Sequence, residues 1–202
     1  NLVVRTAAGT AKWATNTAGH AGSNVLEMQS DGNLVIYHGS SALWSSWYGI
    51  ASSSTSSGLS SKVDAFAAEW LGRQLDSDGV GYQCVDVFKQ FYAEVLAAGT
   101  YGAIGHNGYA ADIWTYFSST SKLTSQFTQV SKTQAPAKGD IAIWDYSLSG
   151  SGGAGHVALV LQSGSAKASS VLVLEQNKSG HSYVEKSTES TANLLGYLRP
   201  KS

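Results

Sequence analysis

The sequence predicts an α+β protein preceded by a small all-β module, and three observations lead to this fold class. Apolar residues recur at helical spacing between residues 62 and 98, whereas after Gly139 they gather in short runs typical of strands. A serine-rich stretch, 48–61, separates this region from the residues before it. Helices followed by consecutive strands favour an antiparallel sheet with the N-terminal helices packed on it.

The composition of the stretch 48–61 divides the chain. We expect a β module over 1–47, a flexible linker over 48–61 and a larger domain over 62–202. The first residues, Asn1–Val4, resemble the end of a strand, so we expect the chain to begin inside a domain.

Overall composition argues against several classes of partner. The formal net charge is −1 and 13% of residues are charged, which gives no electrostatic basis for binding nucleic acid or an anionic membrane. No apolar run approaches the roughly 18 residues of a membrane span. The single cysteine, Cys84, excludes an internal disulfide. The low charge and the many small residues favour a secreted bacterial or phage protein.

A hairpin is predicted in the N-terminal module. Val25–Gln29 and Asn33–Tyr37 are strand-like runs on either side of Ser30–Gly32, a typical tight turn. The string from Gln29 to Tyr37 resembles the motif Gln-x-Asp-x-Asn-x-Val-x-Tyr of the bulb-type, mannose-binding lectins.

This resemblance implies a sugar site. In the lectin family the Gln, Asp, Asn and Tyr side chains of the motif hydrogen-bond a mannose. The matching residues here are Gln29, Asp31, Asn33 and Tyr37. The alternative is that these side chains only hold the turn. Because the match covers about one repeat, and such repeats need neighbours to bury a core, a second chain could complete the module as a dimer.

Amphipathic helices are predicted at the start of the larger domain. The first has apolar residues at helical spacing between Val63 and Leu71, with Ser61 and Asp64 as a candidate capping box. The other predicted helices cover 84–98 and 111–117.

Five strands are predicted after Gly139, each a short run rich in apolar residues. Two of these runs are apolar on both faces, as in a central strand covered by helices. The predicted strands cover 140–144, 156–161, 171–175, 182–185 and 195–198.

Cys84 stands at the entrance of the second predicted helix, after the Gly- and Asp-rich loop 76–82. A thiol attacks as the thiolate, and the N–H groups and dipole of a helix N-terminus stabilise an anion. A buried structural cysteine is the alternative, but such residues usually lie inside an apolar pattern. The polar, glycine-rich entrance favours a nucleophile.

A histidine and a carboxylate lie at matched ends of two predicted strands. His156 opens one apolar strand, and Glu175 closes the next. A hairpin that pairs Leu161 with Ser170 places His156 directly opposite Glu175, on the same face. Glu175 could then orient the imidazole and stabilise its cation. A structural His–Glu pair is the alternative.

Four strings of the larger domain resemble the CHAP family, the cysteine, histidine-dependent amidohydrolase/peptidase domains. The strings are Tyr82–Asp86, Gly139–Trp144, Gly155–Val160 and Leu174–Asn177, in the order that the family has them. The resemblance implies a papain-like fold and cleavage of peptidoglycan.

The CHAP resemblance also implies roles for individual residues. By it, Cys84 is the nucleophile and His156 the general base, while Glu175 and Asn177 orient the base. Gln83 would help to form the oxyanion hole together with backbone N–H groups.

The loop before Cys84 is rich in oxygen ligands and tightly turned, as calcium loops are. Some CHAP domains of phage lysins bind calcium at this place, so the resemblance implies a structural calcium ion. The alternative is a turn whose aspartates cap the helix. The implied ligands are the carboxylates of Asp76, Asp78 and Asp86 and the carbonyls of Val80 and Tyr82.

Together these features predict a secreted or phage-encoded cell-wall hydrolase with peptidoglycan as substrate and no organic cofactor. The N-terminal module would tether it to a mannose-like sugar or another cell-wall glycan. Two other functions stay open: a cysteine acyltransferase or isopeptidase acting on proteins, and a glycan-binding lectin with an inactive catalytic domain. Amidase and endopeptidase activities share the predicted constellation, so the bond that is cut also stays open.

Overall fold

The computed structural model describes residues 1–15, 17–28, 34–39, 41–46, 49–50, 58–103, 108–178 and 180–201. The chain divides into two compact units, Asn1–Ser57 and Gly58–Ser202. Within the described ranges, no helix has the length and apolar character needed to cross a membrane.

The N-terminal unit consists of short antiparallel strands. In it β1 pairs with β2, and β3 to β6 follow one another in a four-stranded sheet. The pairing of Val25 with Tyr37 confirms the predicted hairpin. Ile36, Leu43 and Trp44 form a small buried apolar cluster. The strands are β1 (Val3–Arg5), β2 (Ala11–Ala14), β3 (Asn24–Met28), β4 (Leu34–His38), β5 (Ser41–Ser45) and β6 (Gly49–Ile50).

Parts of the stretch 48–61, which was expected to be a flexible linker, form a strand and the start of a helix. Strand β6 occupies Gly49–Ile50, and helix α1 (Leu59–Trp70) begins at Leu59. Leu59 lies against Gly139, because a Cβ placed on that glycine would be 2.9 Å from the Leu59 Cδ2. This contact extends the buried stripe of the helix by one turn, while the serines that follow are exposed. The first turn of α1 was therefore missed because its serine-rich composition is typical of a linker.

The predicted capping box of Ser61 and Asp64 is wrong. Gly58 is the N-cap of α1, and the Ser61 hydroxyl donates to the Gly58 carbonyl at 2.9 Å. Asp64 pairs instead with Lys138, at 2.5 Å. Since the helix begins earlier than predicted, both residues lie inside it rather than at its entrance.

Helix α2 (Cys84–Glu94) begins at the predicted residue and ends before the predicted Ala98. Ala97 has a φ of +51°, in the left-handed region, so the helical path cannot continue through it. The predicted apolar face is confirmed, since Phe88 and Phe91 are buried.

The region after α2 contains elements that the sequence pattern did not predict. A short α3 and a 3₁₀ turn stand in place of the predicted helix 111–117, and a further helix and strand follow. These segments are too short and too polar to give a periodic signal. They are α3 (Asp112–Thr115), η1 (Phe117–Ser119), α4 (Ser121–Gln126) and β7 (Phe127–Ser131).

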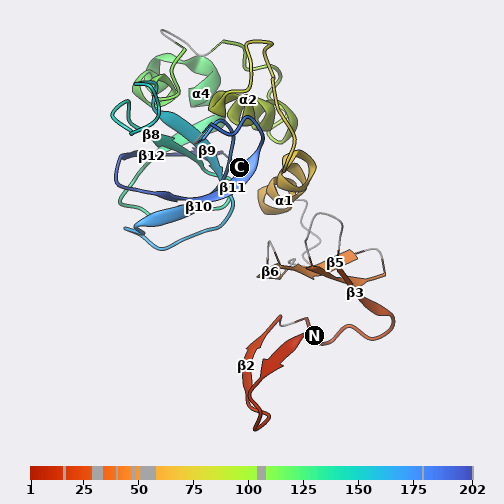
Figure 1. The fold of residues 1–202 in the computed structure, drawn as a ribbon. Coiled ribbons are helices and arrows are strands. Elements are labelled where there is room, and N and C mark those ends of the chain that lie inside the picture. The colour runs from red at the N-terminus through yellow and green to blue at the C-terminus, as the bar shows by residue number, and fades with distance from the viewer. Residues whose placement is uncertain are drawn as a thin grey trace. The chain divides into compact units, whose positions relative to one another are not determined.

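The larger unit contains a six-stranded sheet in the order β11-β10-β9-β8-β12-β7 (Figure 1). All neighbouring pairs are antiparallel, as predicted. Helix α2 packs on β9 and β10. Trp144 and Tyr197 are among the largest fully buried side chains of the unit. The strands are β8 (Ile141–Trp144), β9 (His156–Val160), β10 (Ser170–Glu175), β11 (Glu185–Ser190) and β12 (Leu194–Pro200).

The strand predicted over 182–185 is wrong. The observed strand, β11, begins at Glu185 and runs to Ser190 at one edge of the sheet. Its six residues are all Glu, Lys, Ser or Thr, so the apolar alternation that marks a half-buried strand is missing from it. Only the preceding Val184, which is buried, belongs to the core.

Candidate active site

His156 and Glu175 form a buried pair. His156 is the first residue of β9, and Glu175 is the last residue of the neighbouring β10. The imidazole Nε2 lies 2.5 Å from the Glu175 Oε2, and the two residues are 4% and 0% exposed. The predicted contact between these two side chains is therefore confirmed.

The register predicted for this hairpin is wrong by two residues. Leu159 pairs with Leu174, and Val160 pairs with Val173. Side chains alternate with a period of two along a strand, so a slip of two residues keeps every side chain on its face. His156 and Glu175 thus meet diagonally across the two strands instead of directly opposite each other, which long side chains can do.

A third side chain, Ser187, extends this pair. Ser187 lies on β11, and its hydroxyl donates to the Glu175 Oε1, the oxygen that does not face the histidine. Burial raises the pKa of Glu175, but the hydrogen bond and charge of His156, the Ser187 hydroxyl and the charge of Lys178 outweigh it and lower the pKa. Glu175 is therefore held as a carboxylate.

Cys84 opens α2 and is half-buried. Burial of His156 lowers its pKa, but the hydrogen bonds and negative charges of Cys84 and Glu175 outweigh burial and raise the pKa to about 9. Because Glu175 takes Nε2, the ring nitrogen left for Cys84 is Nδ1. The imidazolium form is thus favoured at neutral pH, between Cys84 and a carboxylate.

Cys84 and His156 both line a cavity of about 490 Å³, within the range usual for ligand sites. Gly155 makes the turn that brings His156 to this cavity. Its φ is +71°, and a Cβ at this position would be 2.5 Å from the Trp144 carbonyl oxygen. No other residue type fits this turn without moving the backbone. The remaining cavity residues are Gln83, Leu148, Ser149, Gly150, Ser151, Ala154, Asn177, Lys178 and Gly180.

The other two predicted catalytic residues, Gln83 and Asn177, also lie on this cavity. Gln83 is the N-cap residue of α2, and its side chain is exposed. Asn177 has a φ of +60°, in the left-handed region that asparagine tolerates better than most residues. Among the described residues, the imidazole of His156 has Glu175 as its hydrogen-bonded support, and Asn177 does not share this contact.

Gln176 links the two sides of the site, and the sequence analysis gave it no role. Its side chain is fully buried. Its amide accepts from the Leu75 N–H at 2.8 Å and donates to the carbonyls of Leu75, at 2.7 Å, and Gln83, at 3.1 Å. The residue after Glu175 is thereby tied to the residue before Cys84.

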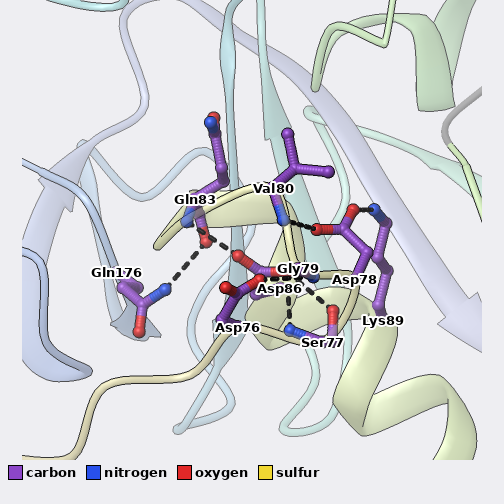
Figure 2. Close-up of polar contacts among 9 residues, drawn as sticks. All are labelled: Asp76, Ser77, Asp78, Gly79, Val80, Gln83, Asp86, Lys89 and Gln176. Carbon is purple, nitrogen blue, oxygen red and sulfur yellow. Dashed lines mark hydrogen bonds and ion pairs between the residues drawn. The ribbon is translucent and has the colours of Figure 1, made fainter.

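Three carboxylates meet where the loop 76–82 joins the first turn of α2, as predicted. Asp76, Asp78 and Asp86 each offer an oxygen within 4.8 Å of the others (Figure 2). Asp86 is fully buried and accepts from the Ser77 N–H at 3.1 Å, the Ser77 hydroxyl at 2.7 Å and the Gln83 N–H at 2.7 Å.

The fit of this loop to calcium depends on what the carboxylates already bind. The ligand type is right, since calcium takes carboxylate and carbonyl oxygens. However, Asp78 pairs with the ammonium of Lys89 and also accepts from the Val80 N–H at 3.1 Å, while Asp76 accepts from the Gly79 N–H at 2.7 Å. In this arrangement a cation would have to displace Lys89, and calcium binding stays a prediction.

The remaining residues predicted to bind calcium or sugar are placed only in part. The side chains of Val80 and Tyr82 are exposed. Tyr37 is half-buried on β4. The other predicted sugar-binding residues, Gln29, Asp31 and Asn33, lie outside the described residues.

The solved structures that resemble the chain include those of LysIME-EF1 and Ly7917. The wild-type endolysin LysIME-EF1 has a TM-score of 0.53 at 21% identity, over 70% of this chain and 63% of that one. Ly7917 has a TM-score of 0.50 at 18% identity, over 71% of this chain and 63% of that one. At these identities the likeness shows the fold, and the chain spans 63% of the length of either protein.

No curated protein matches the chain. The model of one family, the CHAP domain, matches residues 75–177. This range contains both Cys84 and His156, and it ends two residues after Glu175. Because the match covers just over half of the 202 residues, the chain belongs to the CHAP domain family.

Proposed function

We propose that the chain is a peptidoglycan hydrolase that acts on the bacterial cell wall. The observation that carries the proposal is the imidazole of His156, held between Cys84 and Glu175 beside a cavity of about 490 Å³. Membership of the CHAP family and the likeness to an endolysin support the choice of substrate.

In the proposed reaction Cys84 and His156 exchange protons with the substrate. The Cys84 thiolate attacks an amide carbonyl carbon, and the imidazolium of His156 gives its proton to the leaving amine as the C–N bond breaks. Water then loses a proton to His156 and attacks the thioester. The C–S bond breaks, a carboxylic acid leaves, and the thiolate–imidazolium pair is restored. Glu175 stabilises the imidazolium in each half of the reaction.

Two groups at the cavity are proposed to bind the oxyanion of the tetrahedral intermediate. The backbone N–H groups at the start of α2 supply a partial positive charge. The exposed side chain of Gln83, the N-cap residue, can add an N–H donor. Asn177, on the far side of the cavity, would contact the substrate rather than the imidazole.

The proposal is tested by the release of soluble fragments from dye-labelled peptidoglycan of several wall types. Wild-type protein should release dye, and Cys84→Ala should fall to background. Ser60→Ala is a matched control, because Ser60 is exposed on α1 and does not line the cavity. Equal release by wild type and Cys84→Ala, or no release from any wall, would sink the proposal. Transfer of acyl groups onto protein amines in place of fragment release would favour an acyltransferase.

We also propose that the N-terminal unit binds a glycan, as its lectin-like motif implies. Strand β3 ends just before that motif, and its antiparallel partner β4 carries the last part of it, including Tyr37. Binding to mannose and to cell walls is measured with Cys84→Ala, which cannot digest the wall. Tyr37→Ala in that protein should weaken binding, and sedimentation would reveal a dimer. Unchanged binding would argue against the sugar site.

A further inference from the structure

Lys89 is buried in a place where an exposed lysine would be usual. It lies on α2, little more than one turn after Cys84, and its side chain is 6% exposed. Lysine is almost never buried to this extent without a partner, because an unpaired ammonium loses its hydration. Its partner is Asp78, whose side chain is 26% exposed, in the loop that precedes the helix. This pair therefore joins the loop to α2.

The three carboxylates of this cluster are almost fully engaged by the chain itself. Five of the six oxygens of Asp76, Asp78 and Asp86 pair with Lys89 or accept a hydrogen bond. Lys89 compensates part of the negative charge of the three carboxylates. The rest of this negative charge faces N–H and O–H donors of the loop and the N-terminus of α2 (Figure 2). A calcium ion needs six to eight oxygens. To bind the oxygens of Asp78, a calcium ion would have to displace the ammonium of Lys89. Lys89 would then lose its only described carboxylate partner.

The same cluster of carboxylates also holds the N-terminus of α2, where Cys84 lies. Asp86 holds the Gln83 N–H at 2.7 Å and the Ser77 hydroxyl at 2.7 Å, so the loop and the residue before Cys84 are tied to one buried carboxylate. Lys89 anchors the loop on its other side, through Asp78. Loss of either anchor would free the loop that leads into Cys84.

We propose that Lys89 is a built-in cation, a positioning residue that holds the acidic loop on α2 in place of a divalent metal ion. The domain then keeps its fold and the position of Cys84 without calcium. The inference rests on the fold and on the loop contacts, and it does not depend on the proposed function.

The test is thermal melting and calorimetric calcium titration of the full chain. Wild type should melt at the same temperature in EDTA and in calcium, and it should give no heat of calcium binding. Lys89→Met removes the charge but keeps most of the apolar stem. It should melt about 5 °C lower in EDTA, as expected for the loss of a partly buried ion pair, and calcium should restore part of that loss and give a binding heat.

Controls separate the charge of Lys89 from a general effect of substitution. Lys62→Met makes the same change at an exposed helical position and should melt like wild type. Lys89→Arg keeps the cation and should remain insensitive to EDTA. Wild-type protein that binds calcium or melts lower in EDTA would overturn the proposal, as would Lys89→Met that melts like wild type in EDTA. Should Lys89→Met fail to fold, the wild-type titration still decides whether the metal is needed. Both readouts stand even if no peptidoglycan is cut.

Discussion

The two sides of the active-site cavity are built from different interactions. On the sheet side, His156, Glu175 and Ser187 touch one another through their side chains. On the helix side, the buried side chains of Asp86 and Gln176 bind mainly backbone groups of the loop that leads to Cys84. Substitutions on the sheet side should therefore change proton affinity and rate, whereas those on the helix side should change stability and the position of the nucleophile.

Among the substitutions on the sheet side, Glu175→Gln should have the largest effect on the rate. The neutral amide can still accept from the imidazole N–H but cannot stabilise the imidazolium by its charge, so kcat should fall by roughly a hundredfold or more while the melting temperature changes little. The pKa of His156, followed by NMR, should fall below its wild-type value because one of the two groups that raise it is neutralised. Unchanged kcat would show that the carboxylate has no part in the reaction.

Gln176→Leu should remove the contacts that hold the loop on the helix side of the cavity. The substitution leaves the backbone groups of Leu75 and Gln83 buried without their partner, and each unsatisfied group costs about 1–3 kcal/mol. We expect a loss of about 3 kcal/mol in the free energy of unfolding, read from urea denaturation. The pKa of His156 should fall less than in Glu175→Gln, because the contact of the imidazole with Glu175 is kept. A lowered pKa at unchanged stability would reverse the roles of the two sides.

The pH dependence of the reaction tests the contacts of His156 on both sides of the cavity, because Cys84 and Glu175 both raise its pKa. The pKa of His156 is raised from 6.5 to about 9, so the imidazolium persists through neutral pH. Its contribution to stability is complete below the unfolded pKa of 6.5 and is lost as the pH rises through about 9. Since the imidazolium protonates the leaving amine, kcat/KM should fall about tenfold per pH unit above that pKa. A rate that falls already between pH 7 and 8 would contradict the raised pKa.

Ser187→Ala should have the smallest effect. It removes one hydrogen bond to the Glu175 carboxylate, worth about 1.5–3 kcal/mol where the acceptor is charged, but His156 still pairs with that carboxylate. We expect kcat to fall by roughly tenfold at most, with Ser187→Thr as the control that keeps the hydroxyl. A fall as large as that of Glu175→Gln would make Ser187 a full partner of the pair.

The sequence predicted the sheet side better than the helix side, for a physical reason. His156 and Glu175 are polar residues at the ends of apolar strands, which is a strong signal of a buried pair. The register was missed by two residues because strands that are apolar on both faces contain no pattern that fixes it. Ser187 was missed because β11 is a polar edge strand without alternation.

On the helix side, sequence patterns identified Cys84 and the aspartates but not what holds them. Gln176 was quoted only as part of a motif, and nothing in its neighbours indicates three hydrogen bonds to residues 93 and 101 positions earlier in the chain. Lys89 follows the default expectation that a helical lysine faces solvent. Only tertiary contacts show where such long polar side chains end.

The central claim is that Cys84 cleaves an amide bond of peptidoglycan, and mass spectrometry of the digest tests it most directly. Purified peptidoglycan treated with wild type should yield new amine and carboxyl termini, and treatment with Cys84→Ala should yield none. Free stem peptides with bare glycan strands would identify an amidase, and cleaved cross-bridges with stems still attached would identify an endopeptidase. The same products from both proteins, or an undigested wall in both, would contradict the account.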